Sequence, residues 1–274
     1  MAVERIVRVA FEEDGDTDVT SEPIFGPDDR SAGTVVARRT GVVAGLPVAE
    51  AVFAALGAEP VPRAADGDRV GPGDVLLTVT GPTRSLLRAE RTALNLLCHL
   101  SGVATLTRSW VDAIEGTGAR IRDTRKTLPG LRALEKYAVR CGGGVNHRMS
   151  LSDSALIKDN HVAAAGSVTA AYRAVRRRFP DIHIQVECDT LDQVAEALAA
   201  GAGSILLDNM PESEMVEAVR LGRRLGNGRV KFEASGGLTL DRARDVAVTG
   251  VDYLAVGALT HSAAALDIGL DFGT

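Results

Sequence analysis

The sequence predicts an α/β protein with two parts, a small N-terminal α+β layer and an incomplete parallel α/β barrel. Six apolar, strand-like runs between residues 119 and 257, separated by helix-like stretches, predict the barrel. From Lys158 to Glu187 there are 29 positions, and Asp208 lies 21 positions further on. This spacing fits strand–helix units, which join parallel strands by right-handed crossovers. Each run also ends at a polar or glycine residue, as expected where strand ends form the rim of a barrel.

The N-terminal layer, residues 1–82, is predicted from short β-type runs between Gly/Pro turns. Residues 34–38 (ThrValValAlaArg) and 75–79 (ValLeuLeuThrVal) have strand character, and GlyProGlyAsp at 71–74 is a turn. One helix is expected at about 47–57. These elements indicate a small sheet with one helix beside it.

A long helix is expected next, at about 83–115. Its apolar residues recur at helical spacing, as at Leu86, Leu94 and Leu97. ThrGlyAla at 117–119 then leads into the first barrel strand. We therefore predict an N-terminal domain at 1–117, which includes this connecting helix, and a barrel domain at 118–264.

The barrel domain is expected to alternate strands and helices. Strands are predicted at 119–124, 154–158, 182–187, 204–208, 229–235 and 251–257, and helices at 131–141, 166–179, 190–200, 212–225 and 239–249. Because six strands do not make an eight-fold barrel, we predict an incomplete or distorted one. The tail alternates like a strand at 266–272, and we expect 265–274 to join the N-terminal sheet.

Composition narrows the class of protein. Apolar residues make up 45% of the 274 residues and charged residues 24%, which excludes a disordered or fibrous chain. The net charge of −5 argues against nucleic acid as the main partner. No stretch approaches about 18 consecutive apolar residues, so no membrane span is expected. The three cysteines form no CxxC pair, so we expect a reduced, cytoplasmic protein without a disulfide framework or zinc site.

Positive charge is concentrated in residues 120–148. This stretch holds eight Arg or Lys residues and two acidic residues, a local charge of +6, so the rest of the chain carries −11. Such an island suits a small polyanionic ligand better than a long polyanion. A solvated helix face at 130–141 is the alternative, but Arg125 and Lys126 precede that helix and follow a strand.

The motif AspThrArgLysThrLeuProGlyLeuArg at 123–132 is the sharpest local signal for anion binding. Arg125 offers a planar fork for carboxylate or phosphate, and Lys126 offers a mobile positive charge. The start of the following helix adds a further preference for an anion. A surface loop with a capping threonine is the less favoured alternative.

The motif GlyGlyGlyValAsnHisArgMet at 142–149 places three glycines before His147 and Arg148. Consecutive glycines allow the backbone to approach a ligand closely, and both following side chains can bind an anion. A triple glycine alone would indicate only a flexible loop. Its position beside the basic island favours a binding role.

The motif LeuIleLysAspAsnHis at 156–161 ends a strand on Lys158. This lysine could form a Schiff base, as in barrel aldolases, or bind an anion, and the sequence alone leaves both roles open. We interpret His161 as a structural hydrogen-bonding residue.

Carboxylates and small residues end the remaining strands. Glu187 and Asp208 suit Mg²⁺ or sugar hydroxyls, because Mg²⁺ often takes one or two carboxylates plus substrate phosphates. Simple pairing with nearby Arg or Lys fits the spacing equally well. Ser235, Gly236 and Gly257 lie in small-residue turns, whose backbone N–H groups commonly hold a phosphate in barrels.

Seven motifs follow one another along the chain: GluArgThrAlaLeuAsn at 90–95, AspThrArgLysThr at 123–127, AsnHisArg at 146–148, LeuIleLysAspAsnHis at 156–161, ValGlu at 186–187, LeuLeuAspAsnMet at 206–210 and GluAlaSerGlyGly at 233–237. Together they resemble the quinolinate phosphoribosyltransferase family, also known as carboxylating nicotinate-nucleotide pyrophosphorylases, over essentially the whole chain. The resemblance implies an N-terminal α/β sandwich and an incomplete, six- or seven-stranded α/β barrel. It implies transfer of phosphoribose from phosphoribosyl pyrophosphate to quinolinate, with release of pyrophosphate and CO₂, to give nicotinate mononucleotide for NAD biosynthesis.

The resemblance also implies residue roles. Lys158, Glu187 and Asp208 are expected to be catalytic, with Mg²⁺ as cofactor on the two carboxylates, which also bind ribose hydroxyls. A homodimer or higher oligomer is expected, in which Arg91 serves the partner's site. The implied quinolinate-binding residues are Arg91, Arg125, His147, Arg148 and Lys158. Those implied for phosphate groups are Lys126, Lys158, Ser235, Gly236 and Gly257.

Two alternatives remain open at this point. A paralogue associated with molybdenum transport would share the fold without the quinolinate reaction, although the complete cationic set argues against it. A barrel aldolase using Lys158 is disfavoured by the arginine cluster, which suits anionic substrates but does not activate an amine by desolvation.

Overall fold

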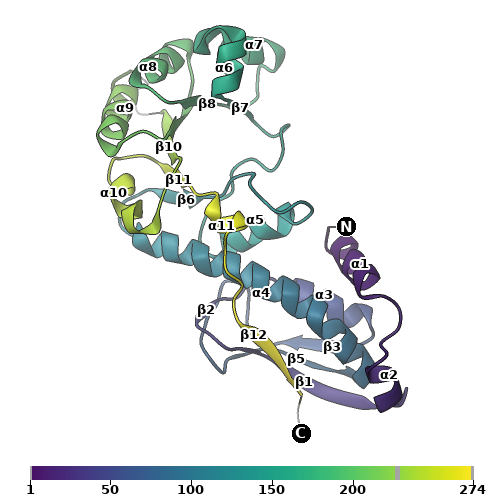
Figure 1. Cartoon of the computed structure of the whole chain (residues 1–274). Coiled ribbons are helices and arrows are strands. Elements are labelled where there is room, and N and C mark those ends of the chain that lie inside the picture. Colours follow the sequence, from purple (N-terminus) through teal and green to yellow (C-terminus); the bar gives the residue numbers. More distant parts are fainter. Residues whose placement is uncertain (1, 226–228, 273–274) are drawn as a thin grey trace. The chain divides into compact units, whose positions relative to one another are not determined.

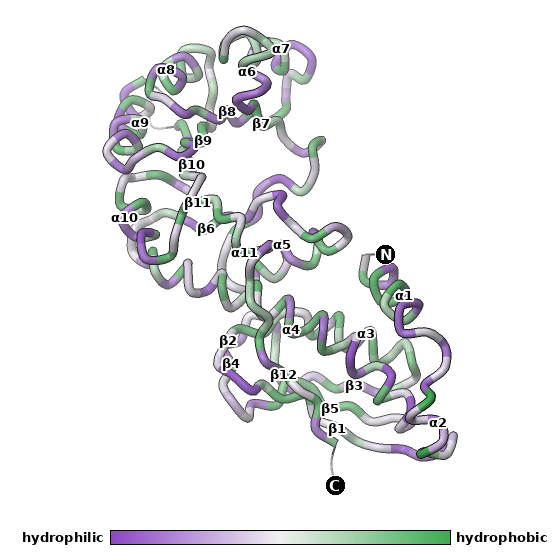
Figure 2. The backbone as a smooth tube through the Cα atoms, viewed as in Figure 1, coloured by the Kyte–Doolittle hydropathy of each residue, from purple (hydrophilic) through white to green (hydrophobic). Residues whose placement is uncertain are grey.

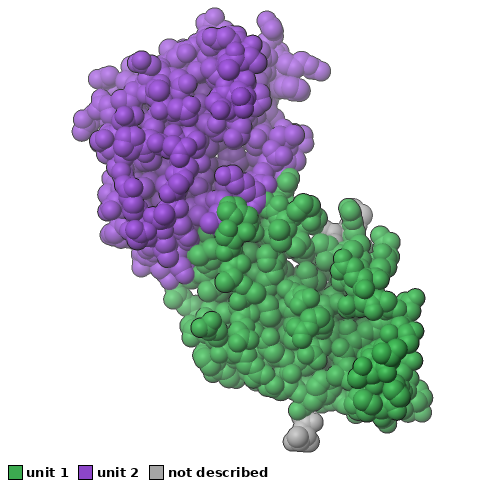
Figure 3. Space-filling view, viewed as in Figure 1, with its two compact units in different colours: residues 1–108, 127–143, 259–274 green, residues 109–126, 144–258 purple. Residues whose placement is uncertain are grey.

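The computed structural model describes residues 2–225 and 229–272 of the chain. The chain forms two compact units, which Figure 3 shows in different colours. Unit 1 consists of residues 1–108, 127–143 and 259–274, and unit 2 consists of residues 109–126 and 144–258. The chain thus passes between the units repeatedly. The domain limits that we infer from the sequence, 1–117 and 118–264, stay a prediction.

Unit 1 contains a four-stranded antiparallel sheet with the strand order β12-β1-β5-β3. Val35 of β1 lies opposite Leu270 of β12 on one side and Leu77 of β5 on the other. The C-terminal strand therefore pairs with an N-terminal strand, and a two-stranded ladder of β2 and β4 lies apart from this sheet. The bounds are β1 Arg30–Ala37, β2 Gly41–Val42, β3 Glu59–Pro62, β4 Arg69–Val70, β5 Val75–Pro82 and β12 Ile268–Phe272.

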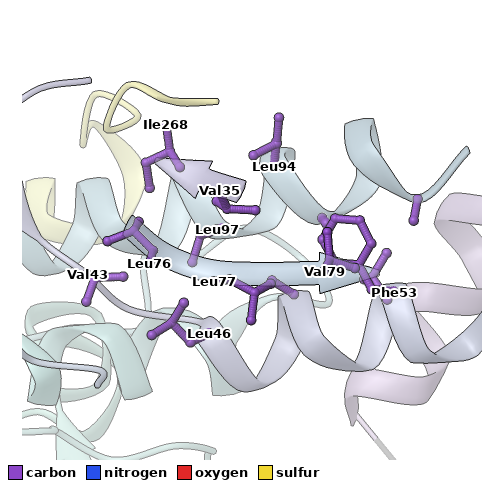
Figure 4. Packing of buried hydrophobic residues seen from close by; sticks show 14 of the residues in the cluster. Val35, Val43, Leu46, Phe53, Leu76, Leu77, Val79, Leu94, Leu97 and Ile268 are labelled. Carbon is purple, nitrogen blue, oxygen red and sulfur yellow. The ribbon is translucent and has the colours of Figure 1, made fainter. Parts of the chain in front are cut away.

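The core of unit 1 forms where helices cover this sheet. Figure 4 shows Phe53 and Leu46 of α3, Leu97 of α4 and Leu77 of β5 gathered in one cluster, and each of them is buried. Burial of one such side chain contributes roughly 1.5–3 kcal/mol. The helices assigned wholly or mainly to unit 1 are α1 Ala2–Asp14, α2 Ser21–Ile24, α3 Leu46–Ala55, α4 Thr83–Ala113, α5 Arg132–Cys141 and α11 Ala258–His261.

Unit 2 contains a six-stranded sheet in which every neighbouring pair is parallel, with the order β6-β11-β10-β9-β8-β7. β6 and β7 are its two edges, so the sheet does not close and the prediction of an incomplete α/β barrel is confirmed. Val145 forms an isolated parallel bridge to Arg122 and thus adds a short extension beside β6. The bounds are β6 Arg120–Arg122, β7 Ala155–Ile157, β8 Ile184–Cys188, β9 Ser204–Asp208, β10 Lys231–Ser235 and β11 Tyr253–Ala255.

Helices connect the strands of unit 2 and follow the outside of its sheet (Figure 1). Their amphipathic character is visible in Figure 2, and in α9 the buried residues Met215, Ala218, Val219 and Gly222 have helical spacing. In the described ranges 2–225 and 229–272, no helix is both long and apolar enough to cross a membrane. The helices are α6 Asp159–Ala165, α7 Val168–Arg178, α8 Leu191–Ala200, α9 Glu212–Leu225, the 3₁₀ turn Leu240–Arg242 and α10 Ala243–Ala247.

The structure differs from the sequence prediction at five helices, of which α2 and α11 are single-turn helices that were not predicted. α1 and α6 were not predicted, although Val3, Val7 and Phe11 of α1 have helical spacing and contact the core of unit 1. α6 has no buried residue, so it lacks the apolar stripe on which helix prediction depends. The helix expected at 239–249 is instead a 3₁₀ turn followed by the short α10.

A substitution at Gly102 tests how α4 packs against the C-terminal tail within unit 1. A Cβ at this position would overlap the carbonyl oxygen of Ala264. Alanine normally stabilises a helix interior by roughly 0.5–1 kcal/mol over glycine, but overpacking costs roughly 1–3 kcal/mol. We therefore expect Gly102→Ala to lower the free energy of unfolding, measured by urea denaturation. Gly203→Ala, where a Cβ meets nothing within 4 Å, is the control. Equal or greater stability of Gly102→Ala would contradict this packing.

Candidate active site

Ten of the eleven residues that the sequence predicts to bind ligand lie at one rim of unit 2. Because all six strands are parallel, their carboxyl ends lie at the same edge of the sheet. Arg91, by contrast, is exposed on α4 in unit 1. Following the order of strands across the sheet, the positions are Arg125 and Lys126 after β6, Gly257 after β11, Ser235 and Gly236 at β10, Asp208 at β9, Glu187 in β8 and Lys158 after β7, with His147 and Arg148 after the Val145 bridge.

Lys158 and Glu187 form an ion pair at this rim. Lys158 Nζ lies 3.1 Å from Glu187 Oε2, and the two side chains are 50% and 10% exposed. The backbone N–H of Lys158 donates to Nδ1 of His161 (2.9 Å), so the predicted structural role of His161 is confirmed. The lysine therefore lies at the mouth of the barrel, directly beside a carboxylate.

The turns after β9 and β10 contact each other through Asn209. Its backbone N–H donates to the carbonyl of Ser235 (2.9 Å), and its side-chain amide donates to Asp208 Oδ2 (2.7 Å). Asn209 has a positive φ of 53°, and Gly236 has a φ of 86°. A Cβ on Gly236 would overlap the Asn209 side chain, so this turn requires glycine.

Acidic groups gather at the β8 and β9 ends of the rim. Burial raises the pKa of Asp189 above its ordinary value, and the charges of Asp208 and Asp159 raise it further. Within the described residues, no three His, Cys, Asp or Glu side chains are arranged to hold a metal ion. Two oxygen donors, Glu187 and Asp208, still suit a hard cation that takes its other ligands from water and substrate.

Two arginines, Arg125 and Arg148, follow adjacent segments at the β6 edge of the sheet. Burial lowers the pKa of Arg148, and the neighbouring positive charge of Arg125 lowers it further. One Arg148 nitrogen, Nη1, donates to the carbonyl of Ser154 (2.8 Å) just before β7. Two guanidinium groups that repel each other in a partly buried position form a site that an anion would stabilise.

A chain of hydrogen bonds leads from His147 into the barrel interior. His147 Nε2 lies 2.7 Å from Gln185 Oε1, and Gln185 Nε2 donates to Glu233 Oε2 (3.2 Å). Arg122 Nη1 donates to the same carboxylate oxygen (2.7 Å). On its other side, His147 Nδ1 accepts the backbone N–H of Arg148 (2.8 Å).

Asp123 fixes the loop that carries His147. This carboxylate is fully buried, and Oδ1 accepts the backbone N–H of His147 (2.8 Å). Its other oxygen accepts the side-chain amide of Asn146. The motif at 123–132 therefore contributes the buried carboxylate of Asp123, which holds the loop, as well as the cations of Arg125 and Lys126.

Gln185 and Glu233 are interior polar residues that were not predicted as functional from the sequence. Each precedes a predicted rim residue by two positions, Glu187 and Ser235, and alternate residues of a strand share one face. That two-residue spacing is the signal that would have identified them. Arg122 was counted in the basic island, but it is paired with Glu233 inside unit 2.

Comparisons with known proteins give one consistent family. The family descriptions "Quinolinate phosphoribosyl transferase, N-terminal domain" and "C-terminal domain" match residues 18–101 and 103–271. A nicotinate-nucleotide pyrophosphorylase [carboxylating] of Mycobacterium leprae is 54% identical over 93% of this chain and 90% of its own length. A probable enzyme of the same name from Bacillus subtilis is 42% identical over 99% of this chain and 93% of its own. The crystal structure of nicotinate-nucleotide pyrophosphorylase from Ehrlichia chaffeensis is similar with a TM-score of 0.93 and 39% identity, over 98% of both chains.

Proposed function

The chain belongs to the quinolinate phosphoribosyltransferase family, and from this premise we propose how the rim of unit 2 carries out the reaction. The chain is a decarboxylating phosphoribosyltransferase of NAD biosynthesis. Its substrates in this reaction are quinolinate, a dianion, and phosphoribosyl pyrophosphate, a polyanion. The molybdenum-transport alternative is not favoured, because the relatives are pyrophosphorylases.

The observation that carries the proposal for quinolinate is the placement of Arg125 and Arg148 on two adjacent segments, after β6 and after the Val145 bridge to β6. Burial lowers the pKa of Arg148, and the positive charge of Arg125 lowers it further. A dicarboxylate would relieve the repulsion between these two charges and accept paired hydrogen bonds from the planar guanidinium groups. We assign the two quinolinate carboxylates to Arg125, Arg148 and Lys158, with His147 beside them.

The remaining rim groups would bind phosphoribosyl pyrophosphate. Ser235, Gly236 and Gly257 would present backbone N–H groups to the 5′-phosphate, and the tight turn at Gly236 supports this assignment. Lys126 and Lys158 would contact phosphate oxygens. Glu187 and Asp208 would accept hydrogen bonds from the ribose hydroxyls and hold Mg²⁺, which when bound neutralises charge on the leaving pyrophosphate.

In the proposed mechanism, the bond from ribose C1 to pyrophosphate breaks while the quinolinate ring nitrogen forms its bond to C1. The ribose becomes oxocarbenium-like, and the carboxylates of Glu187 and Asp208 stabilise its positive charge electrostatically. The product ring nitrogen is cationic. The ring can therefore accept the electron pair of the adjacent C–CO₂ bond as CO₂ leaves, and a proton then replaces the lost carboxylate.

The assembly belongs to the same proposal. We propose a cytoplasmic homodimer in which Arg91 of one subunit completes the site of the other. The position of Arg91 supports this assembly, because the residue is exposed on α4, in the unit that does not contain the rim. An exposed arginine in that position is available to a second copy of the chain.

Release of CO₂ tests the function directly. Purified protein should release labelled CO₂ from carboxyl-labelled quinolinate only when phosphoribosyl pyrophosphate and Mg²⁺ are both present. Equimolar formation of pyrophosphate in the same reaction is the second readout. Release without phosphoribosyl pyrophosphate, or none with every component present, would overturn the proposal.

The carboxylates should matter for turnover more than for quinolinate binding. Glu187→Gln and Asp208→Asn keep side-chain shape but remove charge that stabilises the transition state. Each should lower kcat on the order of a hundredfold. Glu187→Gln also frees Lys158 from its carboxylate partner, so quinolinate affinity measured by calorimetry should hold or rise.

Glu217→Gln on the surface of α9 is the matched control for these two variants, since Glu217 pairs with Arg220 in an exposed position. It should leave both kcat and quinolinate affinity unchanged. Loss of quinolinate binding with normal turnover at saturation would contradict the assignment of Glu187 and Asp208.

Arg91 should act across the dimer. A hydrogen bond between charged groups contributes roughly 1.5–3 kcal/mol, so Arg91→Ala should weaken substrate binding by about ten- to a hundredfold. Lys158→Ala should be inactive as well. If Arg91 acts in trans, a mixed dimer of the two variants has one intact site and should recover half of the wild-type activity per dimer.

The reverse mixture is the control for this complementation. A dimer of wild type with the double variant Arg91→Ala/Lys158→Ala has one lesion in each site if Arg91 acts in trans, and should be inactive. If Arg91 acts in cis, this dimer retains one intact site and the first mixture stays inactive. Tagged subunits purified as mixed dimers distinguish the two outcomes by specific activity alone.

A further inference from the structure

The hydrogen bonds around His147 determine where its proton lies. A backbone N–H can only donate, so the contact from Arg148 N makes Nδ1 of His147 an acceptor. The proton of the neutral ring must then be on Nε2, which donates to Gln185 Oε1 (2.7 Å). Both ring nitrogens are therefore occupied by the protein itself.

The orientation of the Gln185 amide follows from the same reasoning. Its nitrogen donates to the Glu233 carboxylate, which can only accept when ionised. A flipped amide would place its N–H₂ against the Nε2–H of His147 and its oxygen against the carboxylate. Two repulsive contacts would replace two hydrogen bonds, so Glu233 and His147 together fix the direction of this bond chain.

The bond chain is buried and nearly balanced in charge. Gln185 is 2% exposed and Glu233 is 1% exposed. Arg122 neutralises Glu233 and lies over the ring of Tyr253, 3.4 Å from its centroid. His183 lies two positions before Gln185 in the chain and is exposed, and its pKa is lowered by partial burial first and then by Arg122, His147 and Arg176.

We propose that Gln185 and Glu233 are positioning residues for the quinolinate site, an inference that rests on the proposed function. They hold His147 as the neutral Nε2–H tautomer in one ring orientation. Through Nδ1, the ring in turn fixes the backbone at Arg148 and so aims the Arg148 guanidinium at the substrate carboxylates. Neither residue touches the substrate; both act through His147.

Nitrogen NMR of the ligand-free protein tests the tautomer without any activity measurement. The chain has five histidines, so ¹⁵N spectra are simple, and the signals that His147→Gln removes identify the residue. We expect two widely separated His147 nitrogen signals, with the proton on Nε2. A proton on Nδ1, or averaged signals from both tautomers, would overturn the proposal.

Variants of Gln185 test the positioning role. Gln185→Met is similar in shape but has no acceptor for Nε2–H, so the His147 signals should move together. The quinolinate dissociation constant should rise about tenfold, as expected for one lost hydrogen bond. Gln185→Glu restores an acceptor and should restore the separated signals and most of the affinity.

Gln193→Met is the matched control, because Gln193 is the other glutamine of the chain and lies in the first turn of α8. It should change neither the His147 signals nor quinolinate binding. Unchanged His147 signals and unchanged affinity in Gln185→Met would overturn the positioning role. Failure of the wild-type protein to bind quinolinate, with the His147 signals as expected, would instead refute the proposed function and leave the tautomer intact.

Discussion

The parallel direction of all six strands in unit 2 is the constraint on which the site depends. It brings Lys158, Glu187, Asp208 and Ser235 to one rim although long helical segments separate them in the chain. The same pleat has a second consequence, because residues two positions before the rim face the same side of the sheet. Gln185 precedes Glu187 by two positions on the same face of β8, and Glu233 precedes Ser235 in the same way on β10. Rim chemistry and interior hydrogen bonding therefore come from one strand pattern.

A buried carboxylate limits what the barrel interior can contain. Glu233 is almost fully buried, and removal of one partner from a buried ion pair typically costs roughly 3–5 kcal/mol. Arg122 supplies the opposite charge, and the amide of Gln185 supplies a further hydrogen bond. Arg122 Nη1 is therefore engaged by Glu233, while Arg122 Nε is buried without a hydrogen-bond partner. Arg125, Lys126 and Arg148 lie outside this pair, on the two loops that follow β6 and the Val145 bridge.

Much of this arrangement could be predicted from the sequence. The features that could not be predicted depend on contacts between residues that are far apart in the chain. Strand ends, helix stops and the incomplete barrel follow from local periodicity, as Thr190 and Gly201 at the two ends of α8 illustrate. Periodicity identifies a buried face but not what covers it, so α5 could be predicted while its membership of unit 1 could not. The role of Arg122 was also inaccessible, because its partner lies 111 positions away in the chain.

The open side of the barrel explains why the glycine-rich motif belongs to the site. β6 and β7 are edges, and an edge strand leaves backbone groups that need partners. The segment at Val145 satisfies the β6 edge, since its N–H donates to the Ile121 carbonyl (2.8 Å) and its carbonyl accepts the Asp123 N–H (3.2 Å). His147 and Arg148 follow at once, and Arg148 donates to the Ser154 carbonyl beside β7. In a closed barrel, neighbouring strands would occupy these backbone positions. The missing strands thus leave room for a loop that pairs with the edge and carries a cation to the rim.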